Sequence, residues 1–413
     1  MSQETLGARN TRSANFLAPA PLVSSAGSIV HSRDVALDYL KVALILLMVA
    51  HHSCLAYVTF THSTAARRLT PVPVIDAASW RLFDYGQHFN DVFFMSLMFF
   101  VSGLFVWPSL RRSGIPAFIS GRLLRLGVPF AVGVVVLMPL AYYASPQIVG
   151  SSADYFAYWR GFVVRYWPTG PLWFIWLLLL FDILAAGLFI IWPRNIAGMP
   201  FAWTRRNALF AAAAMCAVCA IVYLPGFVAF GGRAWTTLFQ PPLYFQASRF
   251  SLYLVWFAAG AWLGSGCLER GLLARDGALA RNWPWWVLAC PIAYGALMLF
   301  PEEFMAGGAA TPSPPGLVMP LLWVVSNVAS CFAFLAVFRG VVRTRRPWID
   351  SLSRSAYVIY LVHYVYVLWL QRILLALDAA ATVKFLLVFV LSVFFSWLTA
   401  QALLAVPGLR KVL

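Results

Sequence analysis

The sequence predicts an all-α, polytopic transmembrane helical bundle. Of its 413 residues, 62% are hydrophobic and 11% are charged, whereas soluble domains carry roughly 25% charged residues. Apolar runs near the ~20 residues that a helix needs to cross a bilayer recur from one end of the chain to the other. The basic residues gather in short clusters between these runs, as is typical of loops on the cytoplasmic side of a membrane.

Ten spans are predicted in chain order, because ten segments combine sufficient length with a nearly unbroken apolar composition. They cover about residues 36–58, 89–110, 127–145, 171–192, 208–230, 250–267, 284–300, 316–338, 356–377 and 384–405. Residues 1–35, rich in Ser, Ala, Pro and Arg, are expected to form a disordered cytoplasmic tail. Residues 36–405 form the predicted transmembrane domain, and 406–413 a short basic cytoplasmic tail.

The distribution of basic residues predicts that both termini lie in the cytoplasm. An even number of spans puts the termini on one side, and with that side inside, 20 of the 30 basic residues fall in cytoplasmic segments. The net charge of +16 is then a feature of topology and lipid-headgroup contact, and no nucleic-acid partner is expected. We expect a multi-pass protein of the cytoplasmic (plasma) membrane.

The first span contains polar side chains at a regular spacing. The stretch LDYLKVALILLMVAHHSCLAYV holds Asp38, Lys41, His51 and His52. At about 100° per residue, Lys41 and His52 face within about 20° of each other, whereas His51 points about 80° away. Asp38 lies one turn before Lys41, close enough to pair with it. Asp38, Lys41 and His52 therefore form one polar stripe, which must face a protein interior or a water-filled cavity.

Three roles remain open for this stripe. Histidine exchanges protons near neutral pH, so His52 suits general acid–base catalysis. The same groups also suit a proton or substrate relay in a transporter. The third role is structural: a hydrogen bond between helices, with Lys41 extending its charged end to the membrane interface.

Two further regions carry polar groups of interest. Arg122 and Arg125 are three residues apart on a predicted helical turn, where both guanidiniums can bind one phosphate or pyrophosphate. The alternative is anchoring of a cytoplasmic loop. In the ninth span, His363 and Tyr360 can form a buried hydrogen-bond network, or His363 can simply pack. In the second span, Ser102 and Gly103 are small residues suited to close helix contact.

All six cysteines lie in apolar runs, and the sequence shows neither a disulfide framework nor a metal site.

The ordered motifs resemble acyltransferase family 3 of integral membrane proteins, especially its glucan biosynthesis protein C-like branch. The resemblance covers about residues 36–405 and rests on five segments: Leu37–Lys41 followed ten residues later by His52, Phe99–Gly103, Arg122–Pro129, Leu172–Phe174 and Ser355–His363. The chain departs from the family pattern at two positions. Lys41 replaces the usual arginine, and Pro171 stands where many members carry histidine.

The resemblance implies an O-acyltransferase that moves an acyl group from a cytoplasmic acyl thioester to a hydroxyl of an extracytoplasmic glycan or similar acceptor. The implied donor is acyl-CoA, with acetyl-CoA and succinyl-CoA both open, and no bound cofactor is implied. His52 would act as general base or transient acyl carrier, with Lys41, held by Asp38, supplying positive charge. Donor phosphates would bind Arg122 and Arg125. The residues assigned to the cavity or acceptor site are Ser102, Trp173, Tyr360 and His363.

Two rival hypotheses remain at this point. A proton-coupled transporter or flippase would use the Asp38/Lys41/His52 stripe as its relay, although the chain shows no internal repeat of the kind common in transporters. The second rival hypothesis is a family member that has lost catalysis and serves in assembly. The lysine at position 41, in place of the family arginine, is the feature that points to this hypothesis.

Overall fold

The structure is a computed structural model whose described residues are 34–60, 73–145, 154–165, 167–191, 201–232, 234–266, 268, 271–300 and 315–413. The predicted tail over residues 1–35 lies almost wholly outside these residues. Helices account for nearly all of the described secondary structure, and the predicted all-α, polytopic helical bundle is confirmed.

The helices of the first half of the chain are α1 (Val35–Cys54), α2 (Arg81–Gly103), α3 (Val106–Ser113), α4 (Ile115–Arg122), α5 (Val128–Val132), α6 (Met138–Tyr142), α8 (Tyr155–Arg165), α9 (Trp173–Ile191) and α10 (Phe201–Arg206). Those of the second half are α11 (Ala208–Phe230), α12 (Phe250–Ser265), α13 (Ala278–Arg281), α14 (Trp283–Leu297), α16 (Val318–Val341), α17 (Pro347–Leu374) and α18 (Ala381–Ala405). Short 3-10 turns are η1 (Leu55–Tyr57), η5 (Gly170–Leu172), η7 (Ala247–Arg249), η9 (Pro315–Leu317) and η10 (Leu409–Lys411).

Within the described residues, eight helical segments are long and apolar enough to cross a membrane. The predicted spans at 250–267 and 284–300 correspond to α12 and α14, which have 16 and 15 residues. Both helices are shorter than the ~20 residues of a typical span. The count of ten spans and the cytoplasmic placement of the termini therefore stay predictions.

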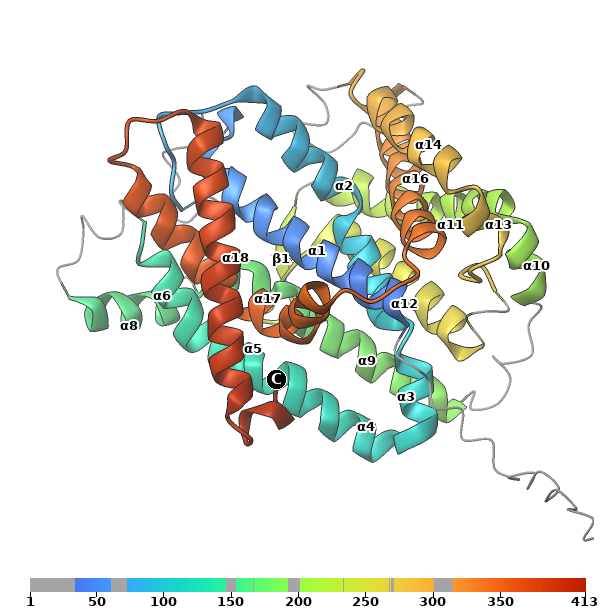
Figure 1. Cartoon of the computed structure of the whole chain (residues 1–413), viewed down its shortest axis with the longest axis horizontal. Coiled ribbons are helices and arrows are strands. Elements are labelled where there is room, and N and C mark those ends of the chain that lie inside the picture. The colour runs from blue at the N-terminus through green and yellow to red at the C-terminus, as the bar shows by residue number, and fades with distance from the viewer. Residues whose placement is uncertain are drawn as a thin grey trace, which may run out of the picture. The chain divides into compact units, whose positions relative to one another are not determined.

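Helix α1 lies inside the bundle. It packs against α17 and α18 on one side and against α2 and α16 on the other, with α14 paired to α16 further out (Figure 1). Leu40 and Leu44 on α1 are fully buried. Because other helices surround α1, its Asp38 and Ser53 are buried and His52 lines a cavity, whereas the Lys41 side chain at the start of the helix is 37% exposed.

Helices α1 and α17 run parallel. Tyr39 near the start of α1 hydrogen-bonds the backbone of Arg346 just before α17. Thirteen residues further along α1, His52 meets His363 in the middle of α17. Helices α1 and α17 correspond to the first and the ninth predicted spans. Because successive spans alternate in direction, these two are required to run the same way.

Helices α2 and α12 approach so closely that their backbones touch. A β-carbon on Gly103 would collide with the carbonyl oxygen of Phe257, and one on Gly260 would collide with that of Phe100. Only glycine permits this contact, which brings small residues of two membrane helices together. The close packing predicted for the Ser102–Gly103 pair is confirmed at Gly103.

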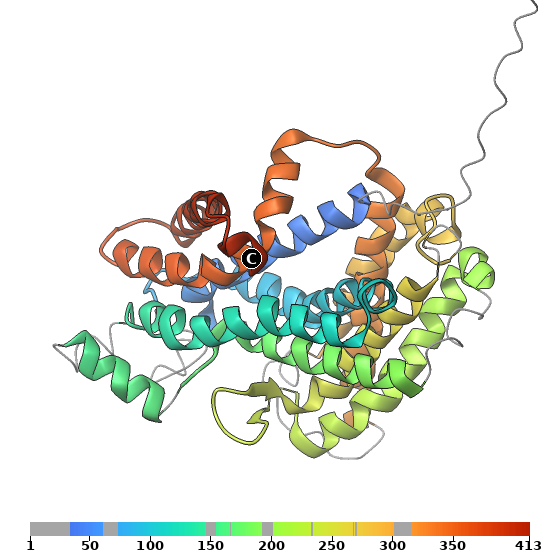
Figure 2. The ribbon, with the colours of Figure 1, turned by 90° about the horizontal axis from the view of Figure 1, so that it is seen from below.

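Residues 115–142 form one long helix that lies alongside α9 (Figure 2). Two π-helical turns interrupt it, η3 (Leu123–Gly127) and η4 (Gly133–Leu137). Each π turn widens the helix locally and rotates the side chains that follow it. Sequence periodicity, which assumes a regular α-helix, did not reveal these turns.

A two-stranded antiparallel hairpin occupies the loop before α12. Strand β1 (Trp235–Thr237) pairs with β2 (Tyr244–Gln246), with Trp235 opposite Gln246. The indole N–H of Trp176 on α9 donates to the carbonyl of Tyr244, at 2.9 Å, and holds the hairpin to that helix. The hairpin thereby covers one side of the cavity described below.

Candidate functional site

A cavity of about 610 Å³ lies where α1, α2, α17, the start of α9 and the hairpin meet. Its volume falls within the range of about 300–1,000 Å³ typical of small-molecule sites. Of the nine residues predicted for the site, three line it: His52, Trp173 and Tyr360. The others lie behind its wall or farther away.

His52 is the predicted residue best placed for chemistry. Its Nδ1 lies 3.0 Å from the carbonyl oxygen of Met48 and 3.2 Å from Nε2 of His363. The other ring nitrogen of His363, Nδ1, lies 2.7 Å from the carbonyl oxygen of Tyr360. His363 is fully buried and does not line the cavity, so it is a partner of His52 rather than a cavity residue.

The hydrogen-bond network assigns the tautomers of both rings. Carbonyl oxygens only accept hydrogen bonds, so the hydrogens lie on Nδ1 of His363 and Nδ1 of His52. Neutral His363 then offers the lone pair of Nε2 to the N–H of His52. His52 keeps an unprotonated Nε2, which can take a proton from a hydroxyl or attack a carbonyl carbon.

The end of α1 is held in position by α17. The side-chain amide of Gln371 donates to the carbonyl oxygens of His52, at 3.0 Å, and of Ser53, at 3.2 Å. These carbonyls belong to the last turn of α1, where the helix itself supplies no donor. The backbone that carries the imidazole is thus fixed by a buried side chain.

Two other predicted residues form part of the aromatic wall. Trp173 packs edge-on against Trp235 of the hairpin, with ring centroids 5.4 Å apart. The hydroxyl of Tyr360 donates to the carbonyl of Pro171 at 2.7 Å. Pro171, at the position where many family members carry histidine, therefore lines the cavity and accepts through its backbone.

Asp38 and Lys41 lie at the opposite end of α1 from His52 and do not line the cavity. Lys41 Nζ is 3.8 Å from a carboxylate oxygen of Asp38 and 3.9 Å from the centroid of the Phe105 ring. The second oxygen of Asp38 is 3.9 Å from the guanidinium of Arg345. The predicted pairing of Asp38 with Lys41 is present, while eleven residues, or about 16 Å of helix, separate Lys41 from His52.

Arg122 and Arg125 lie in different local surroundings. Arg122 Nε is 3.3 Å from the carboxylate of Asp182 on α9, whose side chain is buried. Arg125 is exposed and falls within the π turn η3. The turn begins directly after Arg122, so the alignment that a three-residue spacing gives on a regular α-helix does not apply there.

Ser102 also lies outside the cavity lining. Its hydroxyl donates to the carbonyl of Met98 at 2.8 Å, within its own helix. This is the usual internal bond of a serine in an apolar helix.

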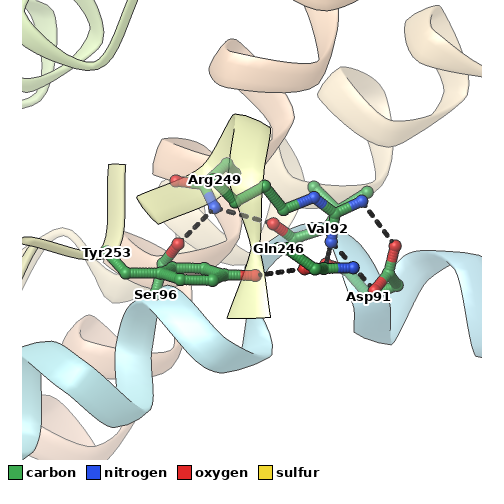
Figure 3. A network of polar contacts seen from close by, with 7 residues as sticks. Asp91, Val92, Ser96, Gln246, Arg249 and Tyr253 are labelled. Carbon is green, nitrogen blue, oxygen red and sulfur yellow. Dashed lines mark hydrogen bonds and ion pairs between the residues drawn. The ribbon is translucent and has the colours of Figure 1, made fainter. Parts of the chain in front are cut away.

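An ion pair between Asp91 and Arg249 borders the cavity and was not predicted. Two guanidinium nitrogens of Arg249 donate to the two carboxylate oxygens of Asp91, at 2.9 and 2.8 Å (Figure 3). Arg249 is 2% exposed, and Asp91 lines the cavity. A carboxylate inside the second predicted span is a signal of the same kind as Asp38, and that rule would have found Asp91. Its partner, 158 residues away, has no local signal.

Two amide side chains on α2 also line the cavity, Gln87 and Asn90. Asn90 is 3% exposed, and both polar atoms of its amide are buried without a hydrogen-bond partner. The amide oxygen of Gln87 is likewise buried and unpaired. Leaving such a group unpaired costs on the order of 1–3 kcal/mol, so these amides are suited to a ligand.

The fold and the cavity together define a class: a polytopic helical membrane protein with an imidazole lining a cavity between its helices. Comparison with family models identifies a more specific class. The model of acyltransferase family 3, described as an acyltransferase domain, matches residues 34–401. The chain belongs to this family and is a membrane acyltransferase, which favours the enzyme hypothesis over the transporter or flippase. No curated protein and no solved structure matches the chain.

Proposed function

We propose that the protein is an O-acyltransferase of the cytoplasmic (inner) membrane, in the glucan biosynthesis protein C-like branch of its family. It moves an acetyl or succinyl group from a cytoplasmic acyl-CoA to a hydroxyl of an extracytoplasmic glycan or similar polyhydroxyl acceptor. The observation that carries this proposal is His52, which lines the cavity with Nδ1 engaged by Met48 and His363. Its Nε2 is left for the reaction.

The reaction can follow either of two routes at Nε2. As general base, His52 takes the proton of the acceptor hydroxyl while the oxygen attacks the thioester carbonyl. The carbon–sulfur bond then breaks, and the departing thiolate takes the proton. As acyl carrier, Nε2 attacks the thioester first and releases the thiolate. The acceptor oxygen then attacks the acyl-imidazole, the carbon–nitrogen bond breaks, and the hydroxyl proton passes to the thiolate. Both routes end with an ester and a free thiol.

The donor would enter from the Lys41 end of α1. In the proposed topology this end faces the cytoplasm, and Lys41, Arg122 and Arg125 are the cations that attract the phosphates of acyl-CoA. The long pantetheine arm would carry the thioester from there along α1 to His52. Lys41 binds phosphate as a point charge, without the two-pronged contact that the family arginine offers. We therefore expect weaker donor binding than an arginine would give.

Substitution of His52 tests the catalytic assignment. His52→Ala should abolish acyl ester on extracytoplasmic glycans, measured by mass spectrometry, and should stop thiol release from acetyl-CoA or succinyl-CoA by the purified protein. His51→Ala alters the neighbouring imidazole, which does not contact His363 within the described network; it should reduce both far less, because it changes the cavity wall but not the group that takes the proton. Unchanged acylation in His52→Ala cells with normal protein levels would refute the assignment.

A further inference from the structure

The cavity wall formed by α2 has a distinct polar patch. Gln87 and Asn90 are three residues apart and so lie on one face of α2, and both line the cavity. The two side-chain amides have four nitrogen and oxygen atoms in all. Three of these are buried with no hydrogen-bond partner: the nitrogen and oxygen of Asn90 and the oxygen of Gln87. His51 adds a buried, unpaired Nδ1 to the same cavity.

This patch extends to the proposed reaction centre. The ring of His51 lies with its centroid 5.2 Å from that of His52. A molecule that contacts the α2 amides and His51 would therefore lie next to the imidazole that takes the proton. The patch is thus placed for an acceptor rather than for the distant nucleotide end of the donor.

The patch carries little net charge. Among the described residues that line the cavity, the one carboxylate is Asp91, and no lysine or arginine lines it. The charge of Asp91 is balanced by the bidentate contact with Arg249. Such a wall offers nothing to neutralise an anionic or a cationic ligand, whose desolvation would then go uncompensated.

Another part of the cavity wall is aromatic. Trp173 and Trp235 pack against each other there, and Tyr244 joins them from the hairpin. Indole and phenol rings cover apolar faces of a ligand and leave their polar ends to hydrogen-bond. A primary amide, in turn, presents a donor and an acceptor side by side, which matches a pair of neighbouring hydroxyls. Apolar faces edged by hydroxyls are the chemistry of a sugar ring.

We infer that Asn90 and Gln87 form a subsite that binds a neutral sugar unit of the acceptor through its hydroxyls, against the Trp173–Trp235 wall. The inference rests on the proposed function and names the substrate class of the same site. Asn90 and Gln87 are specificity-determining residues here, and they take no part in breaking the thioester.

Binding to the full-length protein in nanodiscs tests this without turnover. Titration calorimetry would compare a neutral gluco-oligosaccharide with an oligouronide and a glucosamine oligomer of equal length. The neutral oligosaccharide should bind most tightly. Asn90→Leu should weaken its binding at least about tenfold, because the sugar hydroxyls lose their partners. Gln87→Met, which preserves side-chain length, should also weaken it, and provides a second variant if Asn90→Leu folds poorly.

The matched control is Asn282→Leu, an exposed amide before α14 that does not line the cavity; it should bind as wild type does. In the transfer assay, Asn90→Leu should raise KM for the acceptor and leave KM for acyl-CoA within about twofold. The inference is overturned if Asn90→Leu and Gln87→Met both bind as wild type, if a charged oligomer binds best, or if none binds wild type. Failure of the proposed function would appear separately, as transfer retained in His52→Ala.

Discussion

Replacing Asp91 with asparagine should destabilise the protein by about 3 kcal/mol. The carboxylate receives two charge-assisted hydrogen bonds from Arg249, at 2.9 and 2.8 Å, each worth roughly 1.5–3 kcal/mol. Asparagine keeps one neutral acceptor but leaves the guanidinium, 2% exposed, without a counter-ion. Breaking a buried pair on one side costs about 3–5 kcal/mol, and the retained acceptor sets the expectation at the lower end.

Equilibrium unfolding in mixed micelles of dodecyl maltoside and SDS measures this free energy. The double-mutant cycle compares Asp91→Asn, Arg249→Met and the combined variant. The combined variant removes both charges, so it should be less destabilised than the sum of the two single changes by more than about 1 kcal/mol. An Asp91→Asn protein within about 0.5 kcal/mol of wild type, or a strictly additive cycle, would contradict the reasoning.

Three other substitutions have defined outcomes. His363→Leu should lower thiol release from acyl-CoA about 100-fold in folded protein, because His52 loses one of the two acceptors of its Nδ1–H and keeps only the Met48 carbonyl; a wild-type rate would exclude that role. Gly170→Ala should lower the melting temperature, at a cost of about 1–2 kcal/mol, because the backbone φ there is +49°; an unchanged melting curve would contradict this. Lys384→Met should cost about 3–5 kcal/mol by leaving the buried carboxylate of Asp76 without a counter-ion, and adding Asp76→Asn should recover part of the loss.

The properties of α1 could be predicted because they are local. Hydropathy and length identify the helix, and an eleven-residue spacing on a regular helix gives the common face of Lys41 and His52. The motif spacing selected His52 over His51, and His52 is the one that contacts His363. The orientation of His363 depended on where α17 packs, so its position behind His52 rather than in the cavity was not predictable from its own helix.

Contacts between segments that are distant in the chain could not be predicted from the sequence. Arg249 pairs with Asp91 across 158 residues, and a single sequence gives no register between α2 and the hairpin. The π turn η3 changed the relation between Arg122 and Arg125, because the prediction assumed a regular α-helix there. Gln87 was overlooked because the second span was expected to begin at residue 89, eight residues after α2 actually begins. Asn90 lay inside the expected span, but it carries no charge that would have marked it there.

The glycine contact between α2 and α12 has a consequence for how substrates enter. Gly103 and Gly260 bring the two backbones together near the end of α2, and Arg249, in the turn η7 just before α12, pairs with Asp91 near the middle of α2. Two helices that are joined at two separate points should move as one rigid unit. The α2 side of the cavity is therefore a fixed wall. For the proposed function we therefore expect a bulky acceptor to enter by displacement of the hairpin or of α17 with α18, and engineering of access should target those elements.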